Sequence, residues 1–214
     1  MLKYYGIIRD AAKVIEKAAA DVSSALNDEI IEQEPDFTNQ MIGSIRQAMN
    51  GYRKRGIHWE AKTLTDRGRN SQESVYGADF MGVLNIDLSD YRVSKGFLAQ
   101  AKLIREGRYF NNSEYDRMQN QCERMLRISP ASFVFLYSKD GIYVVPAISI
   151  VSTNRIDPHD LYGRSIRRFY EEHFSSFIGD RRLNIPHVDA LKDIARQFEA
   201  RSALELSAQE IIDA

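Results

Sequence analysis

The sequence predicts an α/β fold in which helices flank a mixed central β-sheet. Apolar residues recur at three- and four-residue steps near the start of the chain, which indicates a helix. Short runs in the middle of the chain are apolar or alternate polar and apolar side chains, which indicates strands. The turn Lys139-Asp140-Gly141 lies between two apolar runs and predicts a β-hairpin. Helices and strands in this order favour an α/β sandwich, and no linker divides the chain into two domains.

Two helices are predicted at the start, over residues 2–26 and after Pro35. The first carries a continuous apolar stripe, so packing is its expected role. Pro35 disfavours helical geometry at Glu34, so a helix boundary is expected there. Either Asp36 or Thr38 is a suitable cap for the second helix. Glu34 is therefore expected at a helix boundary and not on a solvated face.

The remaining elements follow from periodicity and from turn residues. The run at 132–137 is almost continuously apolar, as in a strand buried on both faces. The core is expected at about residues 28–150, within a single domain over 1–214, with a C-terminal helical extension over about 158–214. In chain order, we expect strands at 57–64, 78–88 and 97–104, a helix at 115–128, strands at 132–137 and 141–147, and helices at 158–179, 188–198 and, as a short one, 207–213.

Composition indicates a globular protein of the cytoplasm. Of the 214 residues, 43% are hydrophobic and 28% are charged, which argues against wholesale disorder. A single cysteine, Cys122, excludes an intrachain disulfide and suits a reducing compartment. Neither a signal peptide nor a membrane-spanning run is apparent. Cys122 lies on an apolar helical face, which favours a core position over a nucleophilic role.

The charge distribution says more than the net charge of −1, which by itself argues against a simple electrostatic binder of nucleic acid. Residues 51–110 carry a net charge of +4, whereas the segments before and after are acidic. Two arginines of this segment lie in a polar loop at 65–76, which is either a flap over a substrate or a long hairpin connection. The candidate nucleic-acid contacts are Arg53, Lys54, Arg55, Arg67, Arg69 and Gln121.

Polar residues interrupt two adjacent apolar strands of the predicted sheet. Asp79 lies near the start of one, and Gln100-Ala101-Lys102 lies within the next. Gln100 and Lys102 are two residues apart, so on a strand they project from the same face. A lysine within an apolar strand costs free energy unless a partner or a task holds it there. An acid, an amide oxygen and a lysine at one sheet edge predict a metal-dependent site for phosphodiester cleavage.

These residues and their order resemble the PD-(D/E)XK nuclease superfamily, which has the restriction-endonuclease-like fold. The matching residues are Glu34 on a helix, Gly77-Ala78-Asp79, and Gln100-Ala101-Lys102 at a strand end. A helix around Gln121 and the strand after it also fit the order of that family, over about residues 28–150. The resemblance implies a Mg²⁺-dependent nuclease, with Mn²⁺ as a substitute. DNA is expected as the substrate in preference to RNA.

The resemblance also implies roles for the matching residues. Glu34, Asp79, Gln100 and the carbonyl group of Ala101 would hold Mg²⁺, and Lys102 would assist the attacking water. The sequence departs from the commonest pattern at Gln100, where an acid is usual. A neutral amide oxygen can ligate a hard cation, but one negative charge is lost. An acid from the N-terminal helix is therefore needed; Glu34 is the first choice, with Asp36, Glu32 and Glu29 as alternatives.

Two other interpretations remain open. In the first, Asp79 caps a turn and Lys102 pairs with an acid across the sheet, without any catalytic role. In the second, the chain is a non-catalytic module that binds nucleic acid or protein on a nuclease-like scaffold. The resemblance further implies a homodimer, and a partner protein is another expected source of specificity. Histidines at scattered positions make a zinc site of histidines unlikely in this sequence: His58, His159, His173 and His187.

Overall fold

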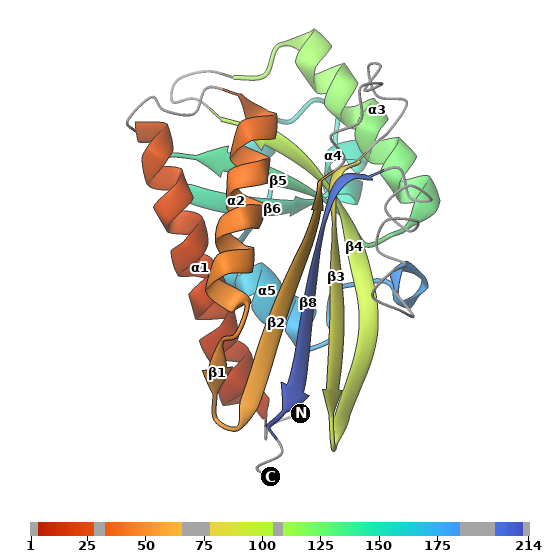
Figure 1. Cartoon of the computed structure of the whole chain (residues 1–214). Helices are drawn as coiled ribbons and strands as arrows, with labels where there is room; N and C mark the ends of the chain where they lie inside the picture. The colour runs from red at the N-terminus through yellow and green to blue at the C-terminus, as the bar shows by residue number, and fades with distance from the viewer. Residues whose placement is uncertain (1–3, 28–32, 66–77, 105–108, 185–199, 212–214) are drawn as a thin grey trace.

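The computed structural model describes residues 4–27, 33–65, 78–104, 109–184 and 200–211 (Figure 1). Short 3₁₀ turns lie at Pro158–Asp160 and Arg181–Leu183. The α-helices of the described residues are α1 Tyr5–Asn27, α2 Glu34–Met49, α3 Asn112–Ile128, α4 Ala147–Ser152 and α5 Ile166–Phe174.

All strands of the described residues belong to one mixed sheet with the order β1-β2-β8-β3-β4-β5-β6-β7. The pairs β3–β8 and β4–β5 are parallel, and the other neighbouring pairs are antiparallel. The α/β class with a mixed sheet is therefore confirmed. The strands are β1 Arg53–Lys54, β2 Ile57–Thr65, β3 Ala78–Leu88, β4 Tyr91–Leu103, β5 Ser132–Ser138, β6 Gly141–Pro146, β7 Arg164–Ser165 and β8 Ala200–Glu210.

Helices cover both faces of this sheet. Helices α1, α2 and α5 pack on one face, where Phe80, Phe97 and Phe135 of the sheet meet Phe169 and Tyr170 of α5. Helices α3 and α4 pack on the other face (Figure 1). Each helix buries an apolar stripe, and burial of such stripes is the main stabilising contribution to a layered fold.

The last described strand corrects the prediction for the C-terminal part of the chain. A short helix was expected at 207–213 within a helical extension, but Ala200–Glu210 forms β8 between β2 and β3. Leu204, Leu206 and Ala208 alternate along it and are buried against the face covered by α1 and α2. The predicted helix at 158–179 shortens to α5 and a 3₁₀ turn, and the one at 188–198 lies outside the described residues.

The boundaries around the candidate site are close to the predicted ones. The predicted strand 78–88 coincides with β3, and β5 is buried on both faces as expected. Helix α2 begins at Glu34, with Gln33 as its N-cap residue and Pro35 in its first turn, so neither Asp36 nor Thr38 caps it. Proline is favourable there because the first turn of a helix has no partner for its N–H groups.

Candidate active site at the end of strand β4

The candidate site lies where β4 extends beyond the beginning of β3. Phe80 is opposite Ala99 in this antiparallel pair, which places Asp79 opposite Gln100. Among the described residues β3 begins at Ala78, so the last backbone N–H groups of β4 have no strand partner there on this side. Two carboxylates take the place of that partner. The N–H of Ala101 donates to Asp79 Oδ2 over 2.9 Å, and the N–H of Leu103 donates to Glu34 Oε1 over 3.3 Å.

Asp79 lies between two side chains from the neighbouring strands. The Gln100 amide nitrogen donates to Asp79 Oδ2 from β4. On β8, Ala200 pairs with Ala78 and Ser202 with Phe80, so Arg201 is beside Asp79, with Nη1 3.9 Å from Oδ1. Burial raises the pKa of the Asp79 carboxyl, while the Ala101 N–H and the charges of Lys102 and Arg201 act in the opposite direction. The arrangement places a buried carboxylate between an amide and a guanidinium group.

Glu34 reaches the same point from the first turn of α2. Its Oε2 atom lies 3.4 Å from Lys102 Nζ, and its charge is one of the influences that raise the pKa of Asp79. A carboxylate at this end of a helix is also stabilised by the unpaired N–H groups of the first turn. Lys102 is 12% exposed, so its ammonium is held mostly out of water beside Glu34. Lys102 thus has an ion-pair partner from a helix, and not from across the sheet.

Gln100 is the most buried polar side chain of this group, at 2% exposure. Its Nε2 atom donates to Asp79 and lies 3.4 Å from the Ala101 carbonyl oxygen, while its Oε1 atom is buried without a hydrogen-bond partner. A buried acceptor without a partner costs free energy. A half-turn of the amide would exchange the two atoms and bring Oε1 beside the Asp79 carboxylate and the Ala101 carbonyl group.

These oxygen atoms are of the type that binds a hard divalent cation, although the site carries few negative charges. Two carboxylates, one amide oxygen without a partner and one backbone carbonyl are the oxygen ligands that Mg²⁺ and Mn²⁺ accept. In the described part of the chain, no three His, Cys, Asp or Glu side chains come together. Neutral oxygens from Gln100 and Ala101 would therefore have to complete the set formed by Glu34 and Asp79.

Of the acids named as alternatives to Glu34, only Asp36 lies in the described part of the chain. Asp36 is exposed two residues further along α2, and Glu29 and Glu32 lie outside the described residues. Asp87 is at the far end of β3, where it pairs with Arg92 at 2.8 Å beside the β3–β4 turn. Among the described acids of α1 and α2, Glu34 is the one with contacts to the end of β4.

Helix α3 passes alongside Lys102. Cys122 is fully buried, and burial raises the pKa of its thiol to about 12 even though the positive charge of Lys102 partly opposes this shift. Such a thiol is a core residue and a poor nucleophile, as predicted. Its neighbour Gln121 has a buried Oε1 atom without a hydrogen-bond partner. Gln100 and Gln121 therefore each hold an unused acceptor oxygen.

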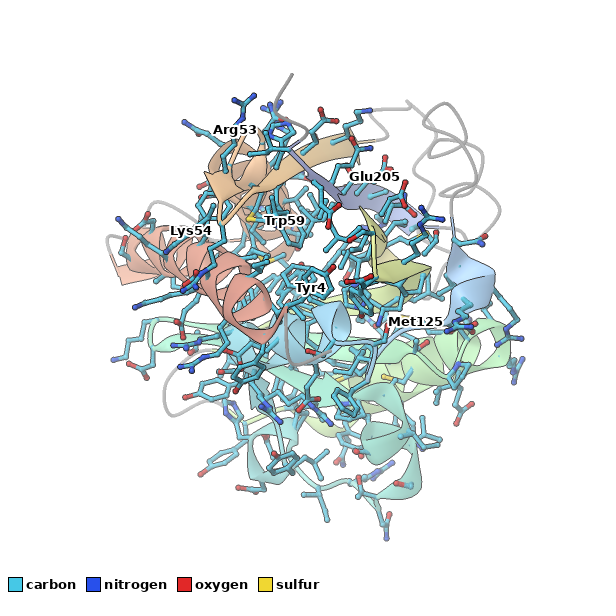
Figure 2. All side chains as sticks on the ribbon, turned by 90° about the horizontal axis from the view of Figure 1, so that it is seen from below. Tyr4, Arg53, Lys54, Trp59, Met125 and Glu205 are labelled. Atoms are coloured by element: carbon cyan, nitrogen blue, oxygen red, sulfur yellow. The ribbon has the colours of Figure 1, made fainter. Side chains whose placement is uncertain are left out.

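The basic residues expected near the site are separated from it. Arg53 and Lys54 form β1, and Arg55 follows them before the start of β2. The first residue of β2 pairs with the last residue of β8, whereas Asp79 neighbours the start of β8. Eight residues of strand span about 26 Å. Figure 2 views the molecule from this far end and shows Arg53 and Lys54 at its periphery. Lys54 and Arg55 pair with Asp10, at 3.4 Å and 2.8 Å. Arg67 and Arg69 lie outside the described residues.

A cleft of about 380 Å³, here called the β4 cleft, opens beside Lys102. The N-terminal turn of α2 forms one wall, the last residues of β4 form a second, and the start of α3 forms a third. Seven of its lining side chains are polar or aromatic: Gln33, Glu34, Lys102, Tyr109, Phe110, Glu114 and Arg117. Because Glu34 and Lys102 line the cleft, it leads directly to the candidate site.

Arg201 is a site residue that the sequence prediction missed. Its strand was assigned to a helical extension, so no cation was expected beside Asp79 from that part of the chain. The signal was the alternation of Leu204, Leu206 and Ala208 with polar residues, which indicates a strand. Recognising a strand there would still not have revealed its position between β2 and β3.

Comparisons with protein-family models, with curated proteins and with solved structures found no match for this chain. None of the helices in the described residues combines the length and the apolar character that crossing a bilayer requires.

Proposed function

We propose that this chain is a metal-dependent nuclease with a restriction-endonuclease-like core, which hydrolyses phosphodiester bonds and acts on DNA as an endonuclease. One observation carries the proposal. Glu34 from α2, Asp79 from β3 and the Gln100-Ala101-Lys102 segment of β4 converge at one sheet edge, although they are far apart in the sequence. Two carboxylates, neutral oxygens and a lysine are the groups that this reaction requires.

The order of elements supports the PD-(D/E)XK interpretation. An acid at the start of α2 is followed by an acid at the start of β3 and by Gln-x-Lys at the end of β4, and then by α3 and β5. This is the order of motifs on which the sequence resemblance rests. Strand β8 is an addition to that order, because it enters the sheet between β2 and β3.

Each residue would have a distinct task in the proposed reaction. Glu34, Asp79, Gln100 through Oε1 and Ala101 through its carbonyl group would hold Mg²⁺. Bound there, the cation would polarise the scissile phosphate and lower the pKa of a coordinated water. Lys102 would position the attacking water or neutralise charge on the phosphoryl oxygens. Arg201 would supply a second positive charge beside Asp79.

Cleavage of plasmid and linear DNA in Mg²⁺ or Mn²⁺ tests the proposal. Asp79→Asn and Lys102→Met should each lower the cleavage rate by about 100-fold or more, because each removes a group required in the transition state. Asp87→Asn is the matched control: it makes the same change on the same strand, at an exposed position at the far end. Circular dichroism should show that all three variants fold. Undiminished cleavage by both site variants would rule out the assigned site.

The second candidate function is a non-catalytic module that binds nucleic acid or protein, and it is favoured by the neutral residue at position 100. The Gln100 amide nitrogen hydrogen-bonds to Asp79, as it would in a site that needs no cation. Calorimetry with Mg²⁺ and Mn²⁺ separates the two candidates. Absence of divalent-ion binding, together with DNA binding in EDTA, would favour the module over the enzyme.

A further inference from the structure

The β4 cleft has the features of a site for one nucleotide. Its volume of about 380 Å³ lies within the range of roughly 300–1,000 Å³ that is typical of small-molecule sites. It is lined by Lys102 and Arg117, which are cations, and by the aromatic side chains of Tyr109 and Phe110. Cations and aromatic rings in one groove are the combination that binds single-stranded nucleic acid, through phosphates and stacked bases.

The aromatic wall is held in place by the residues that follow it. The backbone N–H of Phe110 donates to Asp157 Oδ2 over 3.3 Å, which ties this segment to the turn before Pro158. Asn111 then begins α3 with a capping box, in which its side chain and that of Glu114 each bond the other's backbone N–H at 3.0 Å. Tyr109 remains 74% exposed, although it lines the cleft. Its ring is thus available for contact with a ligand.

The acids of the cleft already have partners. Glu34 bonds the Leu103 N–H and pairs with Lys102, and Glu114 bonds the Asn111 N–H. Arg117 is exposed one turn further along α3. Arg117 and Lys102 thus place two positively charged groups along the cleft beside the carboxylates of Glu34 and Glu114, and either cation can contact a phosphate.

We propose that the β4 cleft binds an unpaired nucleotide next to the phosphate that occupies the candidate site. The bases of an intact duplex are stacked on their neighbours, so only an unpaired or extruded base can stack on Tyr109 or Phe110. The substrate class is then single-stranded DNA, or DNA with a flap or frayed end. This inference deepens the proposed function and rests on it for the position of the cleaved bond.

Binding measurements without catalysis test the inference. Fluorescence anisotropy in EDTA would compare a labelled oligothymidine of twelve nucleotides with a labelled duplex of twelve base pairs. Tyr109→Ala should weaken single-strand binding about tenfold, as loss of one stacked base predicts, and should leave duplex binding unchanged. Tyr109→Phe retains the ring and should bind as the unaltered protein does. Tyr162→Ala is the matched control, because Tyr162 is 79% exposed and stacks on Arg164, outside the cleft.

The outcomes separate this inference from the proposed function. Equal single-strand affinity of Tyr109→Ala and the unaltered protein would overturn the nucleotide site, even if the protein cleaves DNA. An equal loss in Tyr162→Ala would overturn it as well. Selective loss in Tyr109→Ala without any cleavage in Mg²⁺ or Mn²⁺ would support the cleft and contradict the nuclease.

Discussion

Single residues determine what the end of β4 can do. The spacing of Gln100 and Lys102 predicted that they share a face of one strand, and this follows from strand geometry alone. The contact between Gln100 and Asp79 depends on the β3–β4 register, which the sequence does not specify by itself. Glu34 could be placed at a helix boundary from Pro35, but its contact with Lys102 depends on how α2 crosses the sheet.

Lys95 is a second buried lysine, far from Asp79 and without a role in the proposed reaction. It is 2% exposed, and its Nζ atom has no hydrogen-bond partner. Burial, with a smaller effect from Arg181, lowers its pKa from 10.5 to about 7. The buried His173 nearby is neutral around pH 7, because burial and the charge of Lys95 lower the pKa of its imidazole to about 3. Lys95 is therefore expected to reduce stability where it is charged.

Lys95→Met should stabilise the fold on the order of 2 kcal/mol at pH 6, because it removes an unpaired buried charge. Between pH 7 and 10.5 the unfolded chain binds more protons at Lys95 than the folded protein does. The free energy of unfolding of the unaltered protein should then rise with pH across this window, and the advantage of the variant should shrink. Urea denaturation at pH 6 and pH 9.5 measures both effects.

Lys62→Met is the control for this prediction, since Lys62 is exposed on β2. The free energy of unfolding of Lys62→Met, relative to that of the unaltered protein, should be the same at pH 6 and pH 9.5. If Lys95→Met keeps a constant advantage from pH 6 to pH 9.5, the assigned titration is wrong.

Strands and helices were predictable where local signals agreed with their surroundings. The β5–β6 hairpin followed from Asp140-Gly141, where Gly141 has a φ of +126° that a side chain disfavours. Strand β8 was missed because Ala, Leu and Glu favour helices in isolation, whereas its place between two strands stabilises the extended form. Tertiary pairing thus outweighed local propensity in that segment.

The β3–β4 pair depends on the absence of a side chain at Gly82. Gly82 is directly opposite Phe97, and a Cβ atom there would overlap the Phe97 ring. That ring is itself held by edge contacts with Phe80, Phe133 and Phe169. Gly82→Ala should therefore lower the free energy of unfolding by about 2–3 kcal/mol, the cost of overpacking a filled core. Thermal or urea denaturation provides the measurement.

A helical glycine supplies the contrasting case. A Cβ atom on Gly43 of α2 would meet no atom within 4 Å. Gly43→Ala should stabilise the protein by about 0.5–1 kcal/mol, because alanine loses less backbone freedom in a helix. If Gly43→Ala and Gly82→Ala destabilised the protein equally, the overlap with the Phe97 ring would not explain the loss of stability in Gly82→Ala.

At the scale of the whole molecule, β8 joins the two parts of the sheet. It pairs with β2 from Ser202 to Glu210 and with β3 from Ala200 to Gln209. Without it, β2 and β3 would lack their shared neighbour, and Arg201 would be lost from the side of Asp79.

A chain that stops at residue 199 should consequently fail to fold cooperatively. We expect a loss of sheet signal in circular dichroism and of a sharp thermal transition, because the missing strand is central and buried. A chain that stops at residue 211 is the control and should unfold as the unaltered protein does. A cooperative transition in the shorter chain would show that β8 is an appendage and not part of the core.

The central position of β8 also has a consequence for synthesis on the ribosome. Strands β2 and β3 leave the ribosome early, but the edges that β8 pairs with stay unpaired until β8 is translated, more than a hundred residues later. Exposed strand edges invite pairing with other chains. The nascent chain should therefore pass through an interval in which it is prone to aggregate and to bind chaperones. The guanidinium of Arg201 would then reach Asp79 only as that interval closes.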